Sequence, residues 1–509
     1  MDSLTELIRL ITRKRIKKVE LFDENSRNKS SNYYKLFDGI HSGQYHSDAD
    51  AARDIYSCDP SEKKYLILKT RLKQKLLNTL FFLDFEDSNV PDYQNALYEC
   101  NKQLYCAKVL LINGSKRIAI PTIEKTLRRA QESQLTDIEL ECAKILRAHF
   151  STSNQFKEFL QYKEIAELAE QKLHAENLSD KYYQELTAIY AKSKANRNRV
   201  KKLAEKYCKL LEESSRKYES VKLSMNYLRI KVMFHQFSDD YQGAIEATGQ
   251  MENFIRRTLK FHPPSRLEEL TIQKMNFHLH LKDFARGEEL AGQTDKVFEE
   301  GSPNWFTFQE YHFLLAMHTG QYMKAAEIFQ QVVDKPNFRL LPEGKKERWK
   351  IFQAYIHYIY KTHKIREIRP VIQNAKTHFR LNDFLTELPP FAKEKRGLNI
   401  AILSIQILFL LEKMETDKIN PFVDELAKYC RRYPKRDINF RSECFINLLV
   451  NMKNEDYRFY QTRKSSEKLH EEMKSMLMEY HGGNRALEVL PYELLWDTVL
   501  DRLKTYKYG

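Results

Sequence analysis

Glycine and proline are scarce in this sequence, which has only 14 of each in 509 residues. Average usage of about 7% glycine and about 5% proline would give roughly twice as many. Because both residues mark turns and interrupt helices, their scarcity predicts long helices joined by short connections. It argues against glycine-rich α/β folds and all-β folds, and it favours an all-α protein.

Cysteine is also uncommon and shows no pairing pattern. The seven cysteines are scattered, odd in number and without a C-x-x-C spacing. A disulfide framework or a zinc knuckle is therefore not expected. Small apolar thiols of this kind suit a reducing compartment, so we expect a cytoplasmic protein.

Long uncharged runs are missing as well. The longest is GLNIAILSIQILFLL at 397–411, and Asn399, Ser404 and Gln406 interrupt it. A membrane-spanning helix needs about 20 predominantly apolar residues. We therefore expect a buried core helix here and no membrane span. The N-terminus places its acidic residues before its basic run, which is the reverse of a secretory signal.

Signatures of catalysis and of cofactor binding are not found. GEELAGQT at 287–294 has the glycine spacing of a phosphate-binding loop, but Gln293 stands where the loop needs a lysine. His278 and His280 fall on different faces of a helix, and the residues after His470 break the H-E-x-x-H spacing. We expect a protein that is not an enzyme and that uses no cofactor or metal.

What the chain has in excess is positive charge, with a formal net charge of +14. Such a charge favours nucleic acid, acidic proteins or anionic lipid as partners, although a lysine-rich surface spread over a large protein is the simpler interpretation. Hydrophobic residues make up 42% and charged residues 30%, which is typical of a folded chain. The high Lys, Asn, Tyr and Phe content would suit a bacterium with an AT-rich genome.

Apolar residues recur at three- and four-residue steps through nearly the whole chain, which predicts helices. In the N-terminal part, Ser47 is expected to cap one short helix, and Asp59 with Pro60 to begin the next. The acidic stretch 84–92 is expected to be a linker, so that residues 1–86 form a small helical domain, whose segment 31–83 could be a helix-turn-helix-like unit. One stripe of its third helix carries Tyr65, Leu68, Leu72 and Leu76.

A repeated spacing appears beyond the linker. In GQYMKAAEIFQQVV, at 320–333, Tyr322 is followed by a small residue three places on, Ala325, and then by Phe329. The aromatic residue is expected to pack against the preceding helix, and the small residue to let two helix backbones approach closely. Earlier stretches place comparable residues at similar offsets, namely Phe284, Gly287 and Ala291, and Tyr241, Ala244 and Thr248. Separate helices are expected at 153–175 and 179–193.

This spacing resembles that of the tetratricopeptide-repeat family of α-solenoids, whose units of about 34 residues carry a Gly, Tyr, Ala, Phe series. The resemblance is best for 304–337 and weaker for 221–299. It departs from the family pattern where a small residue is expected in the first helix, since Val232, Met275 and Phe313 stand there. The resemblance implies a right-handed superhelical stack of helical hairpins, with tetratricopeptide-like repeats at 87–384 and further repeats and a capping helix at 385–509.

The resemblance also implies a function, because stacked hairpins leave an extended concave face that binds other proteins. We expect a non-catalytic scaffold with a protein or peptide partner. Some tetratricopeptide domains hold a peptide C-terminus with Asn, Lys and Arg on their first helices, and only Asn276 falls at a matching position here. Gln309 and His312, on the next first helix, are further candidate groove residues.

The alternative is a nucleic-acid-binding regulator, with the helical array as its sensor or partner-binding module. In the third N-terminal helix, EKKYLILKTRLKQKLL, one edge carries Lys64, Arg71 and Lys75, a row that could follow phosphates. The competing interpretation is an amphipathic helix whose lysines face the solvent. Two further basic clusters, RKRIKK and KSKANRNRVKK, supply the candidates Arg13, Lys14, Arg15, Arg197 and Arg199.

Overall fold

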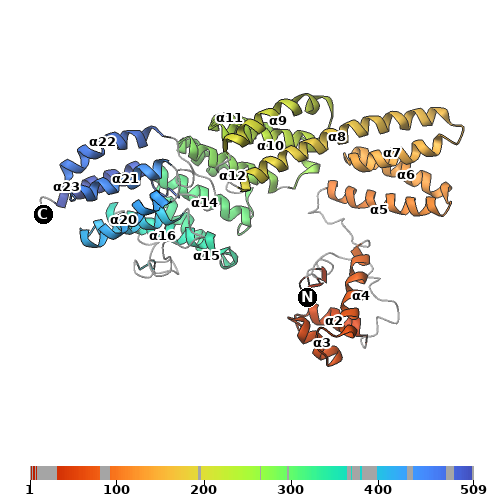
Figure 1. The fold of residues 1–509 in the computed structure, drawn as a ribbon, viewed down its shortest axis with the longest axis horizontal. Coiled ribbons are helices and arrows are strands. Elements are labelled where there is room, and N and C mark those ends of the chain that lie inside the picture. Colours follow the sequence, from red (N-terminus) through yellow and green to blue (C-terminus); the bar gives the residue numbers. More distant parts are fainter. Residues whose placement is uncertain are drawn as a thin grey trace. The chain divides into compact units, whose positions relative to one another are not determined.

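Every regular element that the computed structural model describes is a helix, as the scarcity of glycine and proline predicts (Figure 1). Among the described residues, twenty α-helices and two short 3₁₀ helices follow one another, and successive helices pack in sequential pairs. The described residues are 2, 4–5, 7–8, 31–80, 92–192, 197–263, 265–294, 297–363, 368, 379–380, 384, 398–432, 440–476 and 487–506.

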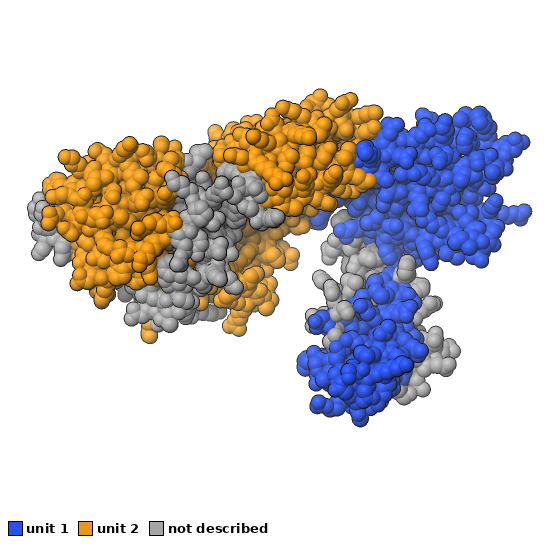
Figure 2. Space-filling view, viewed as in Figure 1, with its two compact units in different colours: residues 1–174, 260–263 blue, residues 175–259, 264–509 orange. Residues whose placement is uncertain are grey.

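The chain divides into two units, which Figure 2 colours separately. The first comprises residues 1–174 and 260–263, and the second comprises residues 175–259 and 264–509. The helices of the first unit are α2 (Asn32–His41), α3 (Asp48–Tyr56), α4 (Lys63–Thr79), α5 (Asp92–Ile112), α6 (Lys116–Glu132) and α7 (Thr136–Phe150), followed by the first part of α8 (Phe156–Lys192).

The second unit holds the rest of α8 and the helices that follow it. Residues 84–91 of the predicted linker and residues 385–397, where the predicted C-terminal repeats begin, lie outside the described residues. The helices are α9 (Arg197–Lys217), α10 (Val221–Phe237), α11 (Tyr241–Arg257), α12 (Ser265–His280), α13 (Phe284–Thr294), α14 (Pro303–His318), α15 (Tyr322–Asp334), α16 (Glu343–His363), α19 (Asn399–Leu411), α20 (Thr416–Arg432), α21 (Phe440–Asn454), α22 (Phe459–Ser475) and α23 (Tyr492–Tyr506), with the 3₁₀ helix Pro336–Leu340. The other 3₁₀ helix, Leu259–Phe261, has its first residue in the second unit and its other residues in the first.

The N-terminal helices follow the predicted caps in part. Ser47 and Asp50 form a capping box at the start of α3, so that start is confirmed. The predicted start of the next helix at Pro60 is wrong. Asp59 accepts hydrogen bonds from the backbone and hydroxyl of Ser61 and so holds a turn, and α4 begins only at Lys63. The predicted apolar stripe of α4 is buried: Tyr65, Leu68, Leu72 and Leu76.

The helix predictions at 153–175 and 179–193 are wrong, because α8 is one continuous helix. Ser179 marks the place where a second helix was expected to begin. Its buried hydroxyl donates a hydrogen bond of 2.7 Å to the backbone oxygen of Glu176, one turn earlier. The side chain therefore bonds within the helix instead of capping a new one.

The predicted close packing of the hairpins is confirmed at Gly287. A Cβ atom at this position would lie 2.6 Å from Cδ2 of Leu315 and 3.2 Å from Cβ of His278, on the preceding helix. Tyr241 and Ala244 are buried at the corresponding places in α11. The small residue therefore has the packing role that its spacing predicts.

Two helices of the second unit are buried on nearly all sides. In α19, the prediction of a buried core helix is confirmed, since every residue except Leu410 is buried. In α14, all residues from Trp305 to Met317 except Thr307 are buried. Both helices belong to one large core that also contains residues of α23. No helix in the described ranges has the length and apolarity to cross a membrane.

Candidate interaction surfaces

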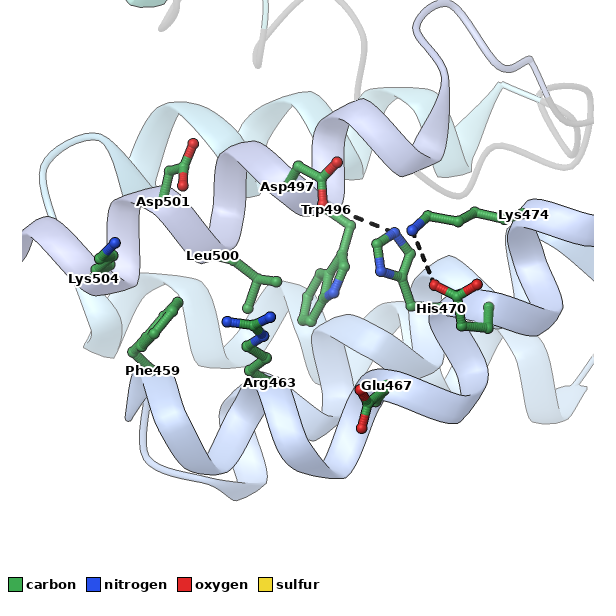
Figure 3. A pocket seen from close by; sticks show the side chains of 11 residues that line it. Phe459, Arg463, Glu467, His470, Lys474, Trp496, Asp497, Leu500, Asp501 and Lys504 are labelled. Atoms are coloured by element: carbon green, nitrogen blue, oxygen red, sulfur yellow. Dashed lines mark hydrogen bonds and ion pairs between the residues drawn. The ribbon is translucent and has the colours of Figure 1, made fainter.

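A groove of about 480 Å³ lies between α22 and α23 (Figure 3). His470 is buried at its wall, with Nε2 3.9 Å from Oδ1 of Asp497. Burial lowers the pKa of this histidine, and the neighbouring ammonium of Lys474 acts in the same direction. The groove carries charges of both signs: Arg463, Lys474, Lys504, Glu467, Glu471, Asp497 and Asp501.

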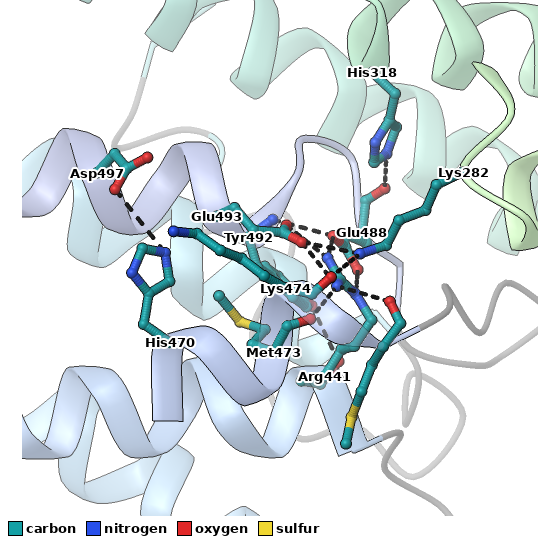
Figure 4. Close-up of polar contacts among 12 residues, drawn as sticks. Lys282, His318, Arg441, His470, Met473, Lys474, Glu488, Tyr492, Glu493 and Asp497 are labelled. Carbon is teal, nitrogen blue, oxygen red and sulfur yellow. Dashed lines mark hydrogen bonds and ion pairs between the residues drawn. The ribbon is translucent and has the colours of Figure 1, made fainter. Parts of the chain in front are cut away.

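A polar cluster lies beside this groove, centred on Arg441 near the start of α21 (Figure 4). Its side chain is only 2% exposed. Two of its nitrogens donate to the carboxylate of Glu488 at 2.7 and 3.1 Å, and two donate to that of Glu493 at 2.7 and 2.9 Å. Nη1 also donates to the backbone oxygen of Met473 at 2.7 Å. These hydrogen bonds and opposite charges offset the free-energy cost of removing the guanidinium from water.

The cluster joins segments that are distant in the sequence. Lys282, after α12, donates to Glu493 at 3.1 Å across 211 residues. His318, at the end of α14, donates from Nε2 to the backbone oxygen of Glu488 at 3.0 Å. Figure 4 shows both side chains reaching toward the cluster from other helices. Residues 487–493 therefore connect α21 with the ends of α12 and α14, and Arg441 connects them to α22 through Met473.

Two groups in this cluster have shifted pKa values. Burial alone would raise the pKa of Glu493, but the hydrogen bonds and charge of Arg441 outweigh it and lower the pKa to about 2. Burial lowers the pKa of His318 and keeps the imidazole neutral near pH 7. The cluster thus combines the ionised carboxylate of Glu493 with a neutral histidine.

The candidate groove residues do not line an open surface. Gln309 and His312 are buried in α14, and His312 lies 3.3 Å from the carboxylate of Glu288, which also bonds Lys324. Asn276 is half-buried in α12, and its side-chain oxygen has no hydrogen-bond partner among the described residues. The structure therefore places two of the three inside the core.

The basic edge of α4 is on the surface. Lys64 and Arg71 are exposed, and Lys75 is half-buried with its ammonium 5.3 Å from the ring centre of Tyr33. Lys64 lies 3.5 Å from Glu62, in the turn before α4. Seven residues separate Lys64 from Arg71 and four separate Arg71 from Lys75, so the helix brings all three to one edge.

The other basic candidates are only partly described. Arg199 is exposed in the first turn of α9. Arg197 belongs to the same helix, but its side chain lies outside the described part. Arg13, Lys14 and Arg15 also lie outside it.

An apolar stripe on the outer face of α5 was not predicted from the sequence. Tyr105 is 62% exposed, Val109 40% and Ile112 84%. The stripe follows i, i+4, i+7 spacing, and Leu104 and Ala107 form a second, buried stripe on the same helix. The two apolar stripes can be recognised in the sequence. They indicate an exposed apolar surface, because a helix at the edge of an array buries only one of them.

Comparison with family models, with curated proteins and with solved structures gave no match for this chain. The resemblance to tetratricopeptide repeats therefore rests on the residues quoted above. Within the described ranges, no group of three or more His, Cys, Asp or Glu side chains has a geometry that could hold a metal ion.

Proposed function

We propose that the protein is a non-catalytic cytoplasmic scaffold, built as a right-handed superhelical stack of tetratricopeptide-like hairpins, and that it binds a protein partner. The observation behind this proposal is the distribution of exposed apolar side chains along the chain. Sixteen large apolar side chains are exposed among the described residues, and ten of them belong to the first unit, which has about a third of the chain. Exposed apolar clusters mark interaction sites.

The stripe on α5 has the form of a helix-binding surface. Tyr105, Val109 and Ile112 lie on one face over two turns, or about 10 Å. Covering one such side chain completely stabilises a complex by about 1.5–3 kcal/mol. A terminal hairpin of a solenoid normally presents a polar outer face to the solvent, so an apolar one favours a bound partner.

Cations surround this stripe and define the partner further. Lys102 lies one turn before Tyr105, and Lys116 and Arg117 are exposed just beyond the end of α5. The partner that fits is an amphipathic helix, with apolar residues on one face and acidic residues beside them. Since Gln309 and His312 are buried, the proposed contact lies on α5 and not on the first helices of the later pairs.

Charge reversal on the stripe tests the proposal. The variant Tyr105→Glu with Val109→Glu and Ile112→Glu changes only exposed positions of α5. The control variant carries Leu259→Glu, Val297→Glu and Leu340→Glu, three exposed apolar positions of the second unit. Both variants should keep the helical circular dichroism of the wild type.

Cross-linking in cell extract followed by quantitative mass spectrometry compares the three proteins. We expect a defined protein to be cross-linked to α5 of the wild type and of the control, and to be lost from the α5 variant. Binding of a synthetic amphipathic acidic helix from that protein should reproduce this order. Equal capture by all three proteins, or cross-links confined to the second unit, would refute the proposal.

A further inference from the structure

Charge is segregated within the N-terminal helices. Helix α4, KKYLILKTRLKQKLLNT, has six lysine or arginine residues and no acidic residue. The rest of the segment 31–80 has only two basic residues, Lys35 and Arg53, against six acidic ones. A helix that serves only to solvate a surface usually mixes both signs, so an acid-free helix beside acidic neighbours is a feature to explain.

One basic residue of α4 bonds to the neighbouring helix, and others are exposed to the solvent. Lys69 forms an ion pair of 2.8 Å with Asp48, which also accepts a hydrogen bond of 2.8 Å from Tyr65. These contacts fasten α4 to α3 and leave Lys69 unavailable to a ligand. Lys63, Arg71 and Lys73 are exposed and form no ion pair with any described residue.

The exposed face of α4 has an ordered composition. Thr70, Gln74 and Asn78 are exposed and lie one turn apart, so they form a row along its centre. Lys64, Arg71 and Lys75 follow one edge of this row. Lys73, two residues after Arg71, lies on the opposite edge. Hydrogen-bonding side chains thus run between two cationic margins.

This arrangement matches the groove of a nucleic acid. The major groove of duplex DNA admits one α-helix, whose central polar residues reach the base edges and whose flanking cations meet phosphates of the two strands. Glutamine and asparagine pair with adenine, and threonine contacts several bases. From Lys64 to Lys75 the edge rises about 16 Å, which corresponds to roughly five base pairs.

A membrane surface would require the opposite order. A helix lying in the lipid interface has apolar residues at the centre of its exposed face and cations at the margins. Of the exposed apolar residues of α4, Leu66 continues the row one turn before Thr70, and Ile67 and Leu77 lie on its two sides, so three of the four positions along the centre are polar. The row therefore favours a hydrogen-bonding ligand over lipid.

We propose that α4 is a groove-binding helix for duplex DNA, with Lys64, Arg71 and Lys75 on the phosphates of one strand and Lys73 on the other. Thr70, Gln74 and Asn78 face the base edges. The surface differs from the stripe on α5, and the proposal does not depend on the scaffold function. The N-terminal helices then attach a protein-binding array to DNA.

Salt-dependent binding of the full chain tests the phosphate contacts. Fluorescence anisotropy with a random-sequence DNA duplex is followed between about 50 and 200 mM salt. The variant Lys64→Gln with Arg71→Gln and Lys75→Gln should lower the magnitude of the log–log salt slope by about 2.7, since each phosphate contact contributes about 0.9. Glutamine preserves helix propensity, so the fold should be kept.

A matched control removes three exposed lysines from α20 and α22, through Lys428→Gln, Lys464→Gln and Lys468→Gln. Its salt slope should equal that of the wild type. A selection from a random duplex library should then yield a preferred site with the wild type. The variant Gln74→Ala should lower the preference at one position by roughly 5- to 150-fold, the range of one good base contact.

Four results would overturn the proposal. They are no binding of duplex DNA, tighter binding of duplex RNA or single strands than of duplex DNA, an equal loss of slope in the control, and binding only to phosphatidylserine vesicles. A selection that enriches no site would also overturn the role of the central row. None of these results bears on the α5 variant.

Discussion

Arg441 is held by the carboxylates of the buried Glu488 and the half-buried Glu493, and its replacement by methionine should destabilise the second unit strongly. The variant leaves Glu488, which is 4% exposed, and Glu493, which is 20% exposed, without their cation. Removing one partner of a buried ion pair typically costs about 3–5 kcal/mol. The backbone oxygen of Met473 also loses its 2.7 Å hydrogen bond. We therefore expect the free energy of unfolding to fall by about 3–5 kcal/mol.

A second variant distinguishes the loss of the ion pairs from the cost of leaving carboxylates without a cation. Arg441→Met combined with Glu488→Gln and Glu493→Gln removes the cation and both carboxylates together. Because a buried charge without a partner is the main cost, this triple variant should be more stable than Arg441→Met alone by about 1–3 kcal/mol. The single variant Glu488→Gln should be less stable than the wild type.

Urea unfolding followed by tryptophan fluorescence measures these differences. All three tryptophans, Trp305, Trp349 and Trp496, are buried in the second unit, so the signal reports on that unit. The midpoints should shift while the slopes stay constant. If Arg441→Met costs less than about 1 kcal/mol, or if the triple variant is the least stable of the set, the account of this cluster is wrong.

Two further predictions concern pH and packing. The pKa of Glu493 is lowered from 4.5 to about 2, so the carboxylate stabilises the fold above pH 4.5, and this stability is lost as the pH falls to about 2. The loss of folding free energy is about 3 kcal/mol, and it should be absent in Glu493→Gln. Acid titration of the tryptophan signal measures it, and equal acid sensitivity of the wild type and the variant would contradict the prediction. Gly287→Ala places a Cβ 2.6 Å from the fully buried Leu315 and should lower the thermal midpoint, at a cost of about 1–3 kcal/mol; Gly292→Ala, with open space around it, should not.

The helices were predictable because their signals are local. Ser47 and Asp50 stand three residues apart, and Tyr241 and Ala244 likewise, so each pattern is complete within one turn. The failures are also local, since Asp59 and Ser179 have side chains that suit a helix cap. In the structure, Asp59 accepts hydrogen bonds within a turn, and Ser179 donates one within a continuous helix. The sequence does not distinguish these two outcomes from a helix cap.

The placement of the candidate groove residues could have been improved. The stretch WFTFQEYHFLLAMH in α14 has large apolar residues on every face, which is typical of a fully buried helix. Gln309 and His312 should therefore have been placed inside. The cluster around Arg441 could not be predicted, because Glu488 is 47 residues away and Lys282 reaches Glu493 across 211 residues. Spacing along a sequence carries no record of such contacts.

The contacts of residues 487–493 have a consequence for the order in which a nascent chain folds. Lys282, His318 and Arg441 find their partners only after these residues have left the ribosome. The cores of α2–α4 and of α5–α7 use near neighbours in sequence and can assemble while translation continues. The second unit must wait for residues 487–493, and during that interval its unpaired basic groups and open core are accessible to chaperones.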